Sequence, residues 1–131
     1  MSEAAIQREI VKFLRMIGGA VWVTSQGYRK DPGGTRMTPG LPDLVVMFPM
    51  DLGLKGGVTR TLGTLDFARW AKSRWTFAEV KTAKGKLSPA QVEFRDESIK
   101  AGVPWHLWRS VEDAKSWAVS VGLVVTLETV E

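Results

Sequence analysis

The sequence predicts a single α/β domain with a mixed central β-sheet flanked by helices. The chain has 131 residues, 44% of them hydrophobic and 24% charged, which suits one soluble domain built around one core. Apolar residues at helical and at strand spacing follow one another along it, in the order helix, strands, helix, strand, helix. That order indicates a mixed sheet within one domain.

The first half of the chain is expected to form one helix and two strands. Residues 2–17 carry apolar side chains at helical spacing, and a Gly-Gly pair ends the pattern. The run AVWVTS at 20–25 is rich in β-branched and aromatic residues and predicts a short strand. A loop with Gly and Pro over 26–39 leads to a second strand at 43–48. The segment 49–73 is the least readable, Gly-rich at first and apolar later.

The second half supplies the remaining elements. We expect a third strand at 75–81, a second helix at 88–101, a fourth strand at 104–108, a third helix at 110–121 and a last edge strand at 123–130. The second helix has the clearest start, because Ser88 is a natural N-cap, Pro89 suits the first helical position and Gln91 completes a capping box.

The composition of the chain limits the kinds of partner and site that we expect. Lys and Arg outnumber Asp and Glu by 18 to 14, which is mild evidence for a polyanionic partner. The chain has no cysteine, which excludes disulfides and thiolate metal sites and fits an intracellular, cytoplasmic protein. No apolar run approaches the roughly 20 residues that span a bilayer, and charged residues interrupt the N-terminal helix, so we expect neither a membrane partner nor a signal peptide.

Two predicted core strands contain charged residues. Asp43 heads the second strand, and Glu79 and Lys81 lie on one face of the third, because side chains alternate along a strand. If the two strands pair, Asp43 and Glu79 meet at one end of the sheet and repel, unless a divalent cation such as Mg²⁺ or Mn²⁺ lies between them. Lys81 could then act on a water or on a phosphate. Alternation alone favours the other interpretation, a structural pair of Glu79 and Lys81 on an exposed sheet face.

The first helix adds a further acid. Glu3 falls on the same helical face as Ile6, Ile10 and Leu14, whereas Glu9 lies at the other margin of this apolar stripe. An acid in the first turn either complements the helix dipole or points into a polar site at the edge of the sheet.

Five motifs follow one another in a recognisable order. They are ExxxQ at 3–7, GLPDL at 40–44, EVK at 79–81, LSPAQ at 87–91 and VPWHLWRSVEDA at 103–114. In this order they resemble the VRR-NUC domain, a branch of the PD-(D/E)XK nuclease superfamily related to Holliday-junction resolvases. The resemblance covers Glu3 to about Ala118. It implies a restriction-endonuclease-like fold and hydrolysis of a DNA phosphodiester.

The resemblance also implies a role for each matching residue. Asp43 and Glu79 would bind the metal, expected to be Mg²⁺ with Mn²⁺ able to substitute, and the Val80 carbonyl is a candidate backbone ligand. Lys81 would act on the attacking water or on the charge of the transition state. Glu3 would bind the metal directly or through water. Gln91 would face the site, and it would keep its place in the capping box if only its backbone serves the cap.

Substrate and assembly are inferred from small members of the family. These resemble structure-selective endonucleases that cut branched DNA, such as Holliday junctions or flaps, as homodimers. We expect the basic residues near the site to contact phosphates, namely Arg29, Lys30, Arg36, Lys84 and Lys86. For Arg29, Lys30 and Arg36 a solvated loop without phosphate contacts is the equal alternative. The alternatives are a restriction-type or single-strand nuclease, or a noncatalytic DNA-binding module of the same fold.

The chain departs from the family pattern in one place. The segment 49–73 separates the Pro-Asp motif from the Glu-x-Lys strand, and we interpret it as an insertion in a single VRR-NUC-like domain spanning 1–131. It is a candidate for a DNA-contacting or dimerising arm. His106 is the only histidine, and we expect it to be a packed or surface residue and not a catalytic base.

Overall fold

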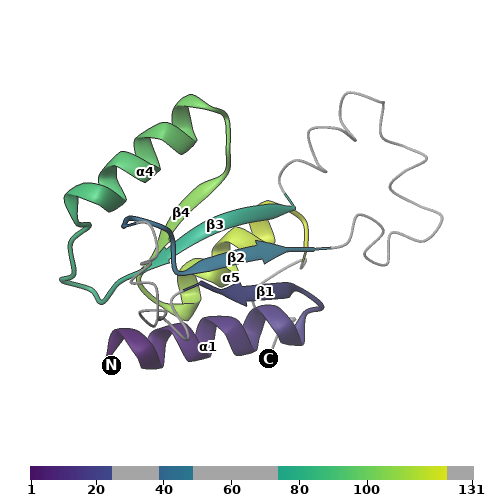
Figure 1. The fold of residues 1–131 in the computed structure, drawn as a ribbon. Helices are drawn as coiled ribbons and strands as arrows, with labels where there is room; N and C mark the ends of the chain where they lie inside the picture. Colours follow the sequence, from purple (N-terminus) through teal and green to yellow (C-terminus); the bar gives the residue numbers. More distant parts are fainter. Residues whose placement is uncertain (25–38, 49–73, 124–131) are drawn as a thin grey trace, which may run out of the picture.

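The computed structural model describes residues 1–24, 39–48 and 74–123 (Figure 1). Within them four strands form one sheet in the order β1 (Ala20–Val23), β2 (Leu44–Met47), β3 (Trp75–Val80), β4 (Trp105–Trp108). The first two pairings are antiparallel, and β3 pairs parallel to β4. The mixed sheet is therefore confirmed. The insertion predicted at 49–73 and residues 124–130 of the predicted last strand lie outside the described residues.

In the described part of the chain three helices flank this sheet, and each begins at a capping side chain. They are α1 (Glu3–Met16), α4 (Pro89–Lys100) and α5 (Val111–Ser120). The hydroxyls of Ser2, Ser88 and Ser110 accept hydrogen bonds from backbone N–H groups of the first turns. Such caps satisfy donors that have no partner inside the helix. The helices predicted from these signals are confirmed to within two residues at each end.

Two helices cover one face of the sheet and the third covers the other. Buried side chains of α1 and α5 join those of β2 and β3 in one apolar core, which includes Ile10, Leu14, Leu44, Val46, Ala78, Val80, Trp117 and Ala118. On the opposite face, Phe94 of α4 packs edge-on against Phe77 of β3, with ring centroids 5.3 Å apart. Figure 1 shows α1 and α4 on opposite sides of the sheet.

Alternation along β3 therefore divides its side chains between two environments. Ala78 and Val80 are fully buried in the core beneath α1 and α5. Phe77 and Glu79 point to the face that α4 covers. This confirms the predicted opposite orientation of Glu79 and Val80. It also shows that the charged face of β3 is a protein-covered face.

No helix in the described part of the chain is long and apolar enough to cross a membrane.

Candidate active site

Asp43 and Glu79 face one another across β2 and β3. Leu44 pairs with Ala78, so the next position of this antiparallel ladder sets Asp43 opposite Glu79, and directly opposite residues share a face. Oδ2 of Asp43 accepts a hydrogen bond from the Val80 N–H at 2.8 Å. The Asp43 carbonyl accepts another from Thr24 N–H at 2.8 Å, and the Thr24 hydroxyl bonds to the Pro42 carbonyl. The pairing of β2 with β3 thus brings the two acids together, as predicted.

Glu79 is a buried carboxyl with one oxygen left over. Its side chain is 1% exposed. Oε1 accepts a hydrogen bond from Nε2 of Gln91 at 2.9 Å, whereas Oε2 has no hydrogen-bond partner among the described residues. Burial raises the pKa of Glu79 to about 9, and the adjoining carboxyl of Asp43 raises it further. Burial and the adjoining negative charge of Asp43 both disfavour an ionised Glu79 unless positive charge is added beside it.

Lys81 and Glu3 complete the electrostatic surroundings of Glu79. Lys81 is half-buried on the same strand face, and its charge lowers the pKa of Glu79, against the larger effects of burial and Asp43. The charge of Glu3, in the exposed first turn of α1, raises it slightly. Glu3 therefore lies within electrostatic range of the site, and it also remains in a position that complements the helix dipole.

The interpretation of Glu79 and Lys81 as a structural pair on an exposed face is wrong. That interpretation requires an exposed carboxylate, but Glu79 is buried beneath α4. The ion pair found among the described residues joins Arg95 to Asp96 instead. Strand alternation gives the face of a side chain but does not tell whether a helix covers that face.

Gln91 serves the helix cap and the site at once. Its Oε1 accepts from the Ser88 N–H at 2.8 Å, closing the capping box, while its Nε2 donates to Glu79. We expected Gln91 to serve both only if its backbone alone formed the cap, and this condition is wrong. The side-chain amide has both an acceptor and a donor, so it bonds to the cap and to Glu79 at the same time.

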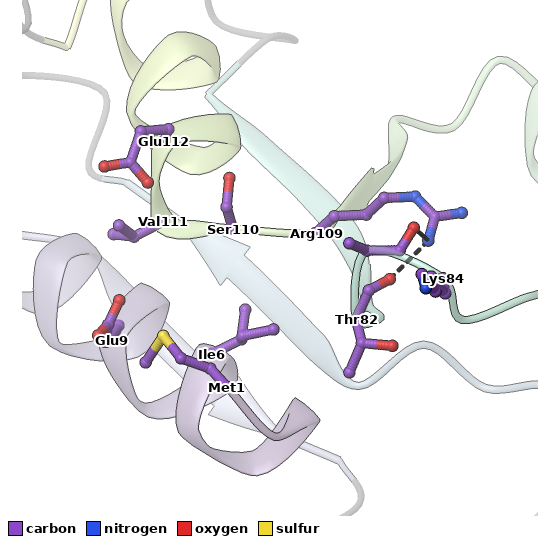
Figure 2. Close-up of a pocket in the computed structure, with 10 residues that line it drawn as sticks. Met1, Ile6, Glu9, Thr82, Lys84, Arg109, Ser110, Val111 and Glu112 are labelled. Carbon is purple, nitrogen blue, oxygen red and sulfur yellow. Dashed lines mark hydrogen bonds between the residues drawn. The ribbon is translucent and has the colours of Figure 1, made fainter.

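The turn that follows β3 is held by an arginine from the end of β4. Nη1 of Arg109 donates to the carbonyls of Thr82, Ala83 and Gly85 at 2.6, 3.2 and 2.7 Å. Figure 2 shows this contact at the wall of a cavity of about 460 Å³ between α1, the start of α5 and the turn. The sequence offers little signal for the contact, since Arg109 lies 24 or more positions from each carbonyl it binds.

The other predicted site residues are distributed as follows. Lys84 and Lys86 are exposed on either side of Gly85, and Lys84 lines the cavity of Figure 2. Arg29, Lys30 and Arg36 lie outside the described residues.

His106 lies on the core face of the sheet, in one of the two environments predicted for it. It pairs with Ala78, on the core face of the sheet, stacks on Trp108 and shares a hydrogen bond of 2.8 Å with the Thr76 hydroxyl. Burial lowers its pKa. It is a packed residue.

Asp43 and Glu79 are the side chains that could hold a divalent cation. The described part of the chain contains no group of three or more His, Cys, Asp or Glu side chains able to hold a metal ion. A cation bound here would therefore depend on two carboxylates together with backbone or water oxygens, a ligand set that suits Mg²⁺.

Comparison with known proteins gives one informative result. No protein-family model matches the sequence, and no curated protein matches it. A solved structure described as a VRR_NUC domain matches with a TM-score of 0.56, covering 92% of this chain and 97% of that chain at 20% sequence identity. At this identity the likeness establishes the fold. The resemblance carried by the five motifs is thus confirmed at the level of architecture, and the chain has the fold of a VRR_NUC domain.

Proposed function

We propose that this protein is a divalent-metal-dependent nuclease that hydrolyses phosphodiester bonds of DNA. The observation that carries the proposal is the pairing of Asp43 with a buried Glu79 whose Oε2 has no partner among the described residues. Lys81 follows directly after β3, two residues beyond Glu79, and its charge acts on Glu79. The likeness to a VRR_NUC domain supports the same chemistry.

The donor set fits Mg²⁺, with Mn²⁺ able to substitute. A divalent cation beside Asp43 and Glu79 would give Oε2 of Glu79 the partner it lacks and would offset the burial that disfavours the ionised form of Glu79. Among the described residues the candidate ligands beside Oε2 of Glu79 are hard oxygens, which these ions prefer. The Val80 carbonyl and Glu3 are the further candidate ligands, Glu3 directly or through water.

Each side chain then has a defined task. A bound cation would supply charge neutralisation for the phosphate and lower the pKa of a coordinated water. Gln91 holds the carboxyl of Glu79 in one orientation through the 2.9 Å hydrogen bond. The Val80 N–H does the same for Asp43. Lys81 would orient the attacking water or stabilise charge on the phosphate oxygens.

A basic groove beside α1 supports nucleic acid as the partner. The groove has a volume of about 730 Å³ and is lined by Ala4, Gln7, Arg8, Val11, Lys12, Arg15 and Val23, with three cations and no acid among them. Nη2 of Arg15 is held by the Val21 carbonyl at 3.0 Å. At 1.5 Å per residue the three cations span about 10 Å of helix, enough to meet successive phosphates of one strand. The α1 end of the groove that carries Ala4 and Gln7 adjoins Glu3.

Branched DNA, such as a Holliday junction or a flap, is the substrate we propose, with a homodimer as the active form. A junction has two equivalent strands to cut, and two-fold assembly would present one site to each. A restriction-type or single-strand nuclease is the alternative within the same chemistry. A noncatalytic DNA-binding module is disfavoured because Asp43, Glu79 and Lys81 are all present.

The test is cleavage of fork, flap, four-way-junction, linear duplex and single-stranded DNA side by side, with Mg²⁺, with Mn²⁺ and with chelator. We expect metal-dependent cutting that prefers the branched substrates and that Glu79→Gln and Asp43→Asn abolish. Light scattering on the same samples tests the dimer. Folded protein that binds DNA but cuts none of these substrates would establish the noncatalytic module instead.

A further inference from the structure

We infer that Arg109 is a positioning residue for Lys81, acting through the turn that follows β3. The inference rests on the proposed function, because Lys81 matters only if phosphate chemistry takes place beside it. Its basis is a continuous chain of contacts from Arg109 to Gly85 and from Gly85 to the side chain of Lys81.

The first link is the convergence of three carbonyls on one guanidinium nitrogen. Nη1 of Arg109 donates to Thr82, Ala83 and Gly85, with the shortest contacts at 2.6 and 2.7 Å. Hydrogen bonds from a charged donor are about twice as strong as neutral ones. Arg109 itself is anchored, because its backbone N–H donates to Oδ2 of Asp113 at 2.8 Å at the start of α5. The turn is thus tied to α5 by Arg109.

The second link joins the turn to Lys81. Lys81 is tied to β4 by its N–H, which donates to the Trp108 carbonyl at 3.1 Å, and the chain then folds back so that Gly85 N–H donates to the Thr82 carbonyl at 3.1 Å. A Cβ added at Gly85 would lie 3.3 Å from Cβ and 3.4 Å from Cδ of Lys81. The side of Gly85 on which a Cβ would stand therefore faces the aliphatic stem of Lys81, with no room for more than a small group between them.

Together the links restrict where the Lys81 ammonium can lie. The Lys side chain is long and has many rotamers, so it is ordered only where a rigid surface packs against it. Here that surface is the Gly85 backbone, and Arg109 holds the backbone in place. Loss of Arg109 would leave the metal-binding acids untouched, since neither Asp43 nor Glu79 contacts it among the hydrogen bonds described. The expected defect is in the chemical step, with DNA and metal binding largely retained.

The first experiment measures single-turnover cleavage at saturating DNA for Arg109→Ala in the full chain. We expect the rate to fall about 10–100-fold, the scale on which small misplacements act, while the Kd for DNA changes by less than about threefold. Added guanidinium should restore part of the rate to Arg109→Ala and none to Lys81→Ala. Arg95→Gln, which removes a half-buried arginine from α4, is the matched control and should cleave at the wild-type rate.

A double variant separates positioning from general structural damage. If Arg109 acts through Lys81, then Arg109→Ala should cost nothing further once Lys81 is Ala. Gly85→Ala, which leaves Arg109 in place, should lower the rate by crowding the Lys81 stem. Additive effects in the double variant, or a wild-type rate in Arg109→Ala, would overturn the inference. If Arg109→Ala does not fold, Arg109→Lys and Gly85→Ala carry the same test.

Hydrogen exchange gives a readout that does not depend on activity. The Gly85 amide should be protected in the wild type and exchange several times faster in Arg109→Ala, with the amides of α4 unchanged as an internal reference. Unchanged exchange at Gly85 would refute the clamp even where the rate falls. If the wild type exchanges as expected but cuts no DNA, the clamp stands while the proposed function, and with it the positioning role, fails.

Discussion

Nε2 of Gln91 donates a hydrogen bond to Oε1 of Glu79 at 2.9 Å while Oε1 of Gln91 accepts from the Ser88 N–H at 2.8 Å. One side chain therefore closes the capping box of α4 and orients a buried acid of the candidate site. The start of α4 and the acid on β3 are thereby set relative to one another, which couples the stability of this helix end to the geometry of the site.

Exchanging Gln91 for Glu should separate the two functions. Glu still accepts from the Ser88 N–H, so the cap is retained, but it cannot donate to Glu79 and adds a negative charge beside it. We expect an unfolding free energy close to wild type in the presence of metal, together with a strongly reduced cleavage rate. Ser88→Ala should do the reverse, losing about 1 kcal/mol of stability with a near-normal rate. Equal rate losses in both variants would contradict this division.

Replacing Glu79 by Gln should stabilise the metal-free protein at neutral pH. The folded pKa of about 9 lies above the ordinary value of 4.5, so folding forces a proton onto Glu79 between these limits. The contribution of Glu79 to the free energy of unfolding is therefore fully present below pH 4.5 and is lost as the pH rises toward 9. We expect Glu79→Gln to be more stable by about 1–3 kcal/mol at pH 7 in chelator, with the difference vanishing near pH 4.5. Urea unfolding across this range measures it, and parallel pH profiles of the two proteins would contradict it.

Added Mg²⁺ or Mn²⁺ should raise the melting temperature of the wild type. A ligand that binds only the folded state stabilises it by about 1.4 kcal/mol at ten times its Kd. Because the cation binds the ionised form of Glu79 and competes with its proton, the rise should be larger at pH 8 than at pH 5. Asp43→Asn and Glu79→Gln should abolish it.

Variants of α1 test whether Glu3 contributes to metal binding. Glu3→Gln should reduce both the thermal shift and the cleavage rate, since Glu3 lies within electrostatic range of Glu79, whereas Glu9→Gln should reduce neither. Small, equal effects of the two would leave Glu3 with its helix-dipole role alone. A full thermal shift in Glu79→Gln would contradict the metal assignment itself.

Neutralising two cations of the α1 groove should weaken DNA binding in a salt-dependent manner. Each phosphate contact contributes about 0.9 to the slope of log K against log salt, so Arg8→Gln with Lys12→Gln should reduce the slope by about 1.8. The cleavage rate at saturating DNA should stay close to wild type. Arg95→Gln with Lys100→Gln removes the same charge from α4, whose exposed surface also carries Glu93, Asp96 and Glu97, and should leave the slope unchanged. An equal loss in both pairs would show a response to net charge only.

The sequence by itself determined the elements of the fold and the chemistry of the site residues. The start of α4 is predicted by Ser88, Pro89 and Gln91, and the buried face of α1 is predicted by the spacing of its apolar residues. Both signals depend only on near neighbours along the chain. The period of a strand likewise puts Glu79 and Lys81 on one face, but the meeting of Asp43 with Glu79 depends on the pairing of Leu44 with Ala78, which only the structure gives.

Only the tertiary structure decided how that chemistry is held. Glu79 is buried because α4 packs over its face of the sheet, and no strand period distinguishes a covered face from an open one. The carbonyls of Thr82, Ala83 and Gly85 meet Arg109 because β4 runs parallel to β3 and delivers Arg109 to the end of the strand from 24 to 27 positions away. Local spacing constrains a residue through its near neighbours in the chain, whereas burial and converging hydrogen bonds depend on packing between distant segments.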